Sequence, residues 1–446
     1  MNIVARIGIR LSQVSNRVVP DPFILALGLT LLVLVFGLML MVNTHPPAEA
    51  VDTILRAWLQ GFGNPAGLAF ALQMALVLLT GQAFAQSPAM TRLLSAAAGI
   101  PRTTAQAGAL VAFITCIASL LHWGLGAIAG AITAREIGRV SRLRGQAFHY
   151  PLLGAAGYTG FAVFHGGLSG SAPLKVAEQG HFLMEQLGVL PVQQTLLSTP
   201  NIAMVVAEVF AFTVLFAVLA PQNGNAAIEP PPDDLPMAPS VERPGPVAFT
   251  IAMAAGPVPL LVLLTALTTG AITLDLNSFC LVFLFAGIAA HGDVERYIAC
   301  VAAAAGPAGL ILLQYPFYFA IVGMMQASGL TVLISETLIA WATPETFGAV
   351  AFLSAAALNL LIPSGGGQWA VQGPILAEAG LALGVDPATI VVAFSHGDAC
   401  TNLLQPFWAL PLLGLMRLRA GQIIGYSVIA CGVMLVIDVV VLLLTE

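Results

Sequence analysis

The residues of this sequence that could do chemistry are polar side chains set inside long apolar runs. Asp398 stands out, because a carboxylate in the core of a bilayer costs about 2.5–3.5 kcal/mol on insertion scales and is a functional candidate by default. Thr401 and Asn402 follow within one helical turn and add side-chain oxygens, which suit a proton or a sodium ion. We predict an ion-coupling site at His396, Asp398, Thr401 and Asn402. The structural alternative for Asp398 is a hydrogen bond to His396 or an N-cap role.

A second group of candidates lies in Phe164–Pro173, which reads FHGGLSGSAP. The unperturbed pKa of histidine is about 6.5, so the His165 imidazole could carry a proton near neutral pH. Ser169 and Ser171 offer hydroxyl groups to an anion. The alternative is a neutral His165 that donates to a backbone carbonyl freed by a break in the helix.

Two glycine-rich segments could bind a carboxylate through backbone N–H groups. Gly124-Leu125-Gly126 follows His122, and Gly365-Gly366-Gly367 follows Ser364. Glycine leaves room for an anion to reach the N–H groups, although small residues also let helices pack closely. We therefore predict that the substrate lies between segments 122–127 and 363–369.

Three larger side chains follow the second segment. Gln368 and Gln372 supply amide donors, and Trp369 supplies either an apolar wall for an acyl chain or an aromatic anchor at the membrane surface. The predicted substrate-binding residues are His122, Gly124, His165, Ser169, Ser171, Ser364, Gly365, Gly366, Gly367, Gln368, Trp369 and Gln372.

The composition places these residues in a membrane. Of the 446 residues, 58% are apolar and only 8% are charged, whereas a soluble protein carries roughly a quarter charged residues. The five cysteines lie far apart with no C-x-x-C pair, which indicates packing residues rather than metal ligands. The net charge of −6 comes from scattered groups and implies no nucleic-acid partner. The composition argues against a water-soluble enzyme.

A bilayer core about 30 Å thick needs about 20 apolar helical residues per crossing, and many runs are long enough. Runs 104–134 and 346–383 differ because each has a glycine-rich centre, where glycine costs about 1 kcal/mol relative to alanine in a helix. We predict that both are re-entrant hairpins, since non-helical backbone survives at that depth only beside protein or a water-filled cavity. The predicted spans are 22–42, 64–86, 150–177, 199–220, 247–270, 274–290, 297–323, 388–416 and 421–444.

The basic residues orient these spans. Lys and Arg are enriched in cytoplasmic loops, and a cytoplasmic N-terminus leaves only Arg56 and Lys175 of the fifteen basic residues outside. Hairpin 104–134 then enters from the cytoplasm and hairpin 346–383 from the opposite side. Residues 1–17 are an arginine-bearing amphipathic lead without a small-residue cleavage site, so we predict no cleavable signal.

The chain divides into two repeats of opposite orientation. Residues 221–246 are rich in proline and acidic residues and predict a semi-rigid cytoplasmic linker between repeats 1–220 and 247–446. Each repeat contains a hairpin and then a broken span, at 150–177 and at 388–416, with the second interruption expected within Phe394–Asn402. We predict an all-α polytopic membrane protein with inverted repeats.

Paired interrupted segments in inverted halves indicate the binding site of a secondary transporter. Freed N–H groups at the start of a half-helix carry partial positive charge and suit a carboxylate. The chain has no G-x-x-x-x-G-K-[ST] loop, so it cannot itself hydrolyse nucleotide. The driving force must come from an ion gradient or from the gradient of the substrate.

Four segments resemble the short-chain fatty acid transporter family. They are RVVPDPF at 17–23, HYPLL at 149–153, FHGGLSGSAPL at 164–174 and IPSGGGQWAVQGP at 362–374. The resemblance implies transport of small monocarboxylates such as butyrate, acetate or acetoacetate. It also implies membership of the ion transporter superfamily, whose members resemble inverted-repeat dimers with a scaffold part and a mobile part.

We therefore expect a secondary active carrier of short monocarboxylates that works by alternating access in the inner (cytoplasmic) membrane. We expect a homodimer in contact with lipid, with a small organic anion as substrate, a proton as the favoured coupling ion and sodium as the alternative, and without cofactor, catalytic residue or nucleic-acid partner. The alternatives are a dicarboxylate or other organic-anion carrier, a channel, and an intramembrane enzyme. The enzyme lacks support because the chain has neither a G-x-S-x-G nor an H-E-x-x-H motif.

Overall fold

The computed structural model describes eight parts of the chain, and within them the regular structure is helical, with no β-strand. The predicted amphipathic lead, nearly all of the linker, His122 and Ser364 lie outside these parts. The described residues are 22–121, 123–146, 148–177, 181, 183–221, 245–272, 276–360 and 365–445.

The helices of the two halves follow in chain order. Those of the first half are α2 (Pro22–Met41), α3 (Pro47–Phe62), α4 (Pro65–Ala85), α5 (Pro88–Ala98), α6 (Thr104–Leu121), α7 (Trp123–Leu143), α8 (Tyr150–Tyr158), α9 (Gly160–Val163), the 3-10 turn η1 (Phe164–Gly166), α10 (Ser171–Val176), α11 (Met184–Leu187) and α12 (Thr199–Val218). Those of the second half are α13 (Pro246–Ala255), α14 (Pro257–Thr268), α15 (Leu276–His291), α16 (Val294–Ser328), α17 (Leu330–Ile339), the 3-10 turn η3 (Pro344–Thr346), α18 (Phe347–Asn359), α19 (Gly365–Ala382), α20 (Pro387–Asn402), α21 (Pro406–Met416) and α22 (Ala420–Thr445).

Local chemistry explains where many of these helices begin and end. Proline lies in the first turn of α3, α12, α20 and α21, where its missing N–H is not needed. The Asp293 carboxylate caps α16 by accepting from the backbone N–H groups of Glu295 and Arg296. Gly329, with a left-handed φ of 72°, ends the same helix after 35 residues.

Within the described ranges, five helices are long and apolar enough to cross a bilayer, and they make this a multi-pass membrane protein. Two of them, Thr199–Val218 and Ala420–Thr445, each contain one buried acidic residue. The full set is Thr104–Leu121, Thr199–Val218, Phe249–Thr268, Ala308–Ser328 and Ala420–Thr445.

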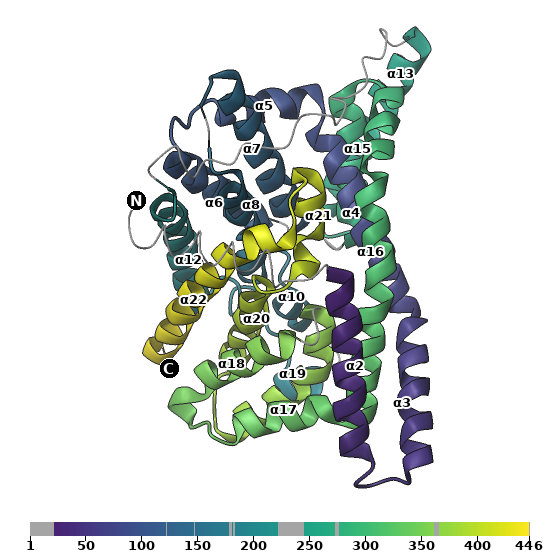
Figure 1. The fold of residues 1–446 in the computed structure, drawn as a ribbon, viewed down its shortest axis with the longest axis vertical. Helices are drawn as coiled ribbons and strands as arrows, with labels where there is room; N and C mark the ends of the chain where they lie inside the picture. Colours follow the sequence, from purple (N-terminus) through teal and green to yellow (C-terminus); the bar gives the residue numbers. More distant parts are fainter. Residues whose placement is uncertain are drawn as a thin grey trace.

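The helices form two groups (Figure 1). Long helices α2, α3, α4, α15 and α16 stand side by side along one edge, and α16 packs against α2, α3 and α4. The other group holds the hairpins, with α6 and α7 in one half of the molecule and α18 and α19 in the other. In each repeat the hairpin packs on the first part of its broken span, α8 and α9 or α20. The second parts cross over: α10 packs on α19 and α20, and α21 packs on α7 and α8.

The second break lies later in the chain than the sequence suggested. α20 is continuous through Asn402, and the interruption covers residues 403–405, so the expected break within Phe394–Asn402 is wrong. Gly397 does not break the helix because its role is close packing: an added Cβ would meet the carbonyl oxygen of Phe352 on α18. Pro406 explains the observed break, because Gln405 before it is held in an extended conformation.

The glycine-rich segments also lie differently from the prediction. Gly124 and Gly126 are in the first turn of α7, and Gly365, Gly366 and Gly367 open α19, so these glycines start the second arm of each hairpin. Gly126 lies against Ser119, which brings α6 and α7 close together. Helices α3, α5 and α17 are additional elements that the predicted spans did not include.

The packing role of Gly397 can be tested with one methyl group. Gly397→Ala should lower the free energy of unfolding by about 1–3 kcal/mol, because α18 and α20 must separate to admit the Cβ. Gly432→Ala on α22 is the control, since nothing lies within 4 Å of an added Cβ there. Thermal unfolding in detergent measures both; a Gly397→Ala protein as stable as the control would contradict the assignment.

Candidate functional site

The centre of the molecule is the place where the two broken spans cross. The Tyr158 hydroxyl at the end of α8 lies 2.5 Å from the carbonyl oxygen of Asn402 and 2.7 Å from that of Gln405, and its one hydrogen is shared between these two acceptors. The Asn402 side chain donates back to the Phe161 carbonyl at 3.3 Å. All four residues are buried. The side chains of one span thus satisfy the backbone carbonyls that the break in the other releases.

The first hairpin packs on the first interruption. The Leu168 N–H donates to the Leu120 carbonyl at 2.8 Å, and Ser169 Oγ accepts from the Trp123 N–H at 3.1 Å. An added Cβ on Gly167 would meet the Leu120 backbone, so only glycine allows this approach. The tip of α6 and α7 is therefore fixed to the loop before α10.

The second hairpin packs on the second interruption through Asn359, the last residue of α18. Its amide nitrogen donates to Thr401 Oγ1 at 3.0 Å and to Asn402 Oδ1 at 2.9 Å. Gln405 donates to the Asn359 carbonyl, and Thr401 donates to the Ala356 carbonyl at 2.7 Å. Both hairpins therefore supply hydrogen-bond partners at the break of their own repeat.

An imidazole, a carboxylate and a helix start meet beside this crossing. His165 Nε2 in η1 is 3.5 Å from Asp398 Oδ2 on α20, and both side chains are buried. Gly365, the first residue of α19, lies directly on the His165 ring. The two ring nitrogens of His165 have no hydrogen-bond partner among the described residues. The same is true of Asp398 Oδ1. These atoms are free to serve a bound ion, proton or substrate.

The start of α19 gives this place its polarity. An 18-residue helix carries roughly half a positive charge at its N-terminus, where the first N–H groups lack partners within the helix. Gly366 in that turn is exposed, while Gly365 is buried against His165. The arrangement suits an anion whose carboxylate meets the N–H groups of α19.

Aromatic rings line the crossing on the side of the first hairpin. The rings of Trp123 and Phe161 lie 5.9 Å apart, those of Trp123 and Trp408 5.6 Å, and those of Phe161 and Trp408 5.7 Å. They come from α7, α9 and α21. This group is a buried apolar cluster beside the polar crossing.

Some predicted residues instead hold the second hairpin together. Gln368 donates to the Ala355 carbonyl and to Gln372 Oε1, both at 2.9 Å, and Gln372 donates to Ser354 Oγ at 2.6 Å. Trp369 is fully buried, with its ring 4.8 Å from that of Phe394, and so is not at the protein surface. Ser171 is half-buried at the start of α10.

His396 faces away from Asp398. Residues two apart on a helix point in different directions, and His396 contacts Glu208 and Asn201 on α12. The predicted ion-coupling residues therefore fall into two places: Asp398, Thr401 and Asn402 face the crossing, and His396 faces α12.

Sequence reasoning missed four residues of this region. Glu208 and Asp438 are single acidic residues inside the apolar helices α12 and α22, and the rule that singled out Asp398 applies equally to them. Asn201 and Tyr158 had no such signal, because their importance comes from backbone carbonyls that only the fold brings close.

A bundle of apolar helices with inverted hairpins, two crossing broken helices and a polar centre defines a transporter of small molecules. The chain belongs to the short chain fatty acid transporter family, whose model matches residues 3–445.

Relatives cover almost the whole chain. A protein of Escherichia coli (strain K12), provisionally named as a short-chain fatty acid transporter, is 35% identical over 441 residues, which are 96% of this chain and 97% of that protein. A Haemophilus influenzae protein with the same provisional name is 34% identical over 448 residues, with the same coverage. A crystal structure of the Alcanivorax borkumensis YdaH transporter aligns with a TM-score of 0.49 at 19% identity, over 95% of this chain and 98% of that one.

The bridging hydroxyl of Tyr158 can be removed without changing the ring. Tyr158→Phe should lower the free energy of unfolding by about 1–3 kcal/mol, because the carbonyls of Asn402 and Gln405 lose a donor in a buried place. Tyr297→Phe on α16 is the matched control, since its buried hydroxyl has no hydrogen-bond partner among the described residues. Thermal unfolding in detergent reports both; equal melting temperatures for the two variants would show that the bridge is unimportant.

Proposed function

We propose that this protein is a secondary active transporter that moves short-chain monocarboxylates such as butyrate, acetate or acetoacetate by alternating access with a proton. It works in the cytoplasmic membrane, with its N-terminus in the cytoplasm, as a homodimer. The family and the names of its relatives support the substrate class. The proposed binding of substrate and proton is argued from the crossing of the broken spans.

The observation that carries the proposal is the start of α19 against His165 and Asp398. A carboxylate bound by the N–H groups of Gly366 and Gly367 lies within one helical turn of this pair. A negative substrate next to Asp398 requires a compensating proton, because two bare carboxylates repel strongly away from water. Substrate and proton therefore bind together, which is the condition for symport.

The surroundings fit a small anion with one charge. One helix N-terminus supplies partial charge for one carboxylate, and the rings of Trp123, Phe161 and Trp408 offer an apolar surface for a short acyl chain. Lys175 on α10 is exposed rather than part of the buried crossing. A dicarboxylate would call for a second positive group among the buried residues.

The hydrogen bonds of the crossing favour a proton over sodium as the coupling ion. Sodium would need several oxygens with free lone pairs around Asp398. Thr401 Oγ1 and Asn402 Oδ1, the candidates on the same face of α20, are turned toward the Asn359 amide nitrogen, and each gives one lone pair to it, which makes them less available to an ion. The imidazole of His165 has no hydrogen-bond partner among the described residues and faces Asp398 with Nε2, so it can take a proton but is not a sodium ligand.

Uptake into liposomes tests the transport function. Liposomes that contain the purified protein should take up more labelled butyrate than empty liposomes do when the outside is made more acidic. A sodium gradient imposed at constant pH should not increase this uptake. A series from acetate to hexanoate reports chain-length preference. The proposal is wrong if no carboxylate enters above the empty-liposome level under proton, sodium or counter-substrate gradients, and flux linear in concentration without counterflow would indicate a channel.

Asp398→Asn removes the carboxylate that faces the substrate. It should lower proton-driven uptake at least about tenfold and change KM, because the residue lies beside the proposed carboxylate position. Asp386→Asn is the matched control on the same helix, since its side chain caps α20 at the Ala388 N–H and asparagine also caps. Uptake by Asp398→Asn with wild-type pH dependence would exclude a coupling role.

A further inference from the structure

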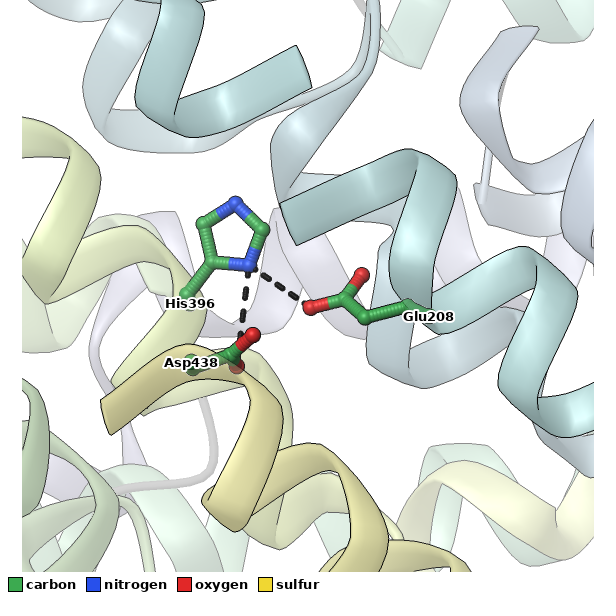
Figure 2. A group of neighbouring side chains, drawn as sticks. All are labelled: Glu208, His396 and Asp438. Atoms are coloured by element: carbon green, nitrogen blue, oxygen red, sulfur yellow. Dashed lines mark hydrogen bonds and ion pairs between the residues drawn. The ribbon is translucent and has the colours of Figure 1, made fainter. Parts of the chain in front are cut away.

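Three helices bring a second buried ionisable cluster together outside the crossing. Figure 2 shows Glu208 of α12, His396 of α20 and Asp438 of α22 pointing toward one another. His396 Nδ1 is 2.9 Å from Glu208 Oε1 and 3.8 Å from Asp438 Oδ2. The three side chains are fully buried. Two acids and one imidazole thus share a space closed to water.

Asn201 determines which nitrogen of His396 carries hydrogen. The Asn201 amide nitrogen donates to the carbonyls of Leu196 at 2.7 Å and Gly166 at 3.0 Å. Its oxygen must therefore face His396 Nε2, at 2.9 Å, and an amide oxygen can only accept. His396 Nε2 consequently carries a hydrogen.

This assignment requires another proton on the opposite side of the ring. The 2.9 Å contact between Nδ1 and Glu208 Oε1 is a hydrogen bond, so either an imidazolium donates to a carboxylate or a carboxylic acid donates to a neutral ring. Glu208 Oε2 and both Asp438 oxygens form no hydrogen bond of good geometry with the described residues, although the two carboxyl groups lie close enough to share a proton. Two ionised, unpaired carboxylates cannot stay buried at this spacing. The cluster therefore holds protons in this conformation.

The distances favour protons over a metal ion. Two ligands on a tetrahedral zinc ion, with bonds of about 2.0–2.2 Å, lie about 3.3 Å or more apart. The Nδ1 to Oε1 distance of 2.9 Å is shorter than that and typical of a hydrogen bond.

Few other ionisable groups face the cluster in the described part of the chain. Cys116 on α6 lies within electrostatic range of Glu208, and Cys400 on α20 and Cys431 on α22 lie near Asp438, with their sulfurs 3.6 Å apart. On the side of the crossing, His165 lies within electrostatic range of His396. No Lys or Arg of the described ranges forms an ion pair with Glu208 or Asp438. Protons are thus the available compensating charge.

We propose that Glu208, His396 and Asp438 form the site that carries the transported proton, and that Asn201 links its protonation state to the first broken span. The proposal rests on the proton coupling proposed above and adds a second protonation site to the one at Asp398, with the cluster holding the proton through the change of conformation. The Asn201 side-chain oxygen accepts from His396, and its side-chain nitrogen donates to the carbonyl of Gly166. Gly166 is the neighbour of His165 in the chain, so Asn201 connects the two places. Loss of a proton leaves like charges facing each other on α12 and α22, so the deprotonated cluster favours a conformation that admits water.

Two variants imitate the protonated acids and cannot release a proton. Glu208→Gln and Asp438→Asn should lower butyrate uptake driven by a pH gradient at least about tenfold, and should abolish the proton flux seen by a pH dye inside the liposomes. Exchange of labelled for unlabelled butyrate at equal pH should continue, because it needs no proton release. Glu208→Asp, which keeps a titratable group, should retain part of the proton flux.

Asp293→Asn is the matched control for removal of a buried carboxylate. Asp293 is also buried but caps α16, a role that asparagine can fill, so uptake and exchange should both stay within about twofold of wild type. The proposal would be overturned if the Glu208→Gln and Asp438→Asn proteins kept a proton flux within twofold of wild type while their exchange activity was intact. So would a wild-type protein that loses uptake with a chelator and binds one metal ion that Glu208→Gln does not bind.

Infrared spectroscopy separates this proposal from the transport function. The wild-type protein should show a carbonyl stretch of protonated carboxyl groups that changes with pH, and Glu208→Gln and Asp438→Asn should each remove part of it. Absence of any transported carboxylate, together with these bands, would reject the proposed function and leave the protonated cluster standing. If both variants showed the same carbonyl bands as the wild-type protein, the protonated cluster would be rejected whether or not butyrate is transported.

Discussion

The structure depends on one constraint: every backbone group that a broken helix releases inside an apolar bundle must find a partner in the protein or in a water-filled cavity. Tyr158 supplies it for the end of α20, Asn402 supplies it for Phe161, and the tip of the first hairpin supplies it for the Leu168 N–H. Because each break is completed by the other break and by a hairpin, the four segments form one unit. The hairpins thus help to stabilise both breaks.

Helix geometry separates the ionisable side chains on α20. Asp398 faces the crossing and His396, two residues earlier, faces α12, so a single helix borders two polar places of different character. One lies beside the exposed start of α19, and the other is sealed among α12, α20 and α22. Asn201 and Gly166 join them through hydrogen bonds of fixed direction. A shift of the first broken span therefore changes the surroundings of His396 directly.

The sequence predicts the class of this fold because the apolar runs are long and their exceptions are few. All-helical structure, inverted hairpins and the family follow from the runs and from the segment around Gly365. The second break could not be placed from glycine content, because Gly397 serves packing against Phe352 while Pro406 ends the helix. Glu208 and Asp438 were visible as lone acids in apolar helices, but their meeting at His396 depends on distances across three helices. Helix α3 was not predicted because the spans were identified from long apolar runs, and the exposed charged pair Asp52 and Arg56 interrupts this segment.

The length of α16 ties the protein to its host membrane. At 1.5 Å per residue its 35 residues span about 52 Å, well beyond a hydrocarbon core of about 30 Å. The helix must tilt or extend into the headgroup regions, and it packs against α2, α3 and α4 along one edge of the molecule. The length of the lipid chains therefore affects the tilt of α16, since a thicker bilayer favours a smaller tilt of this edge relative to the hairpins beside it.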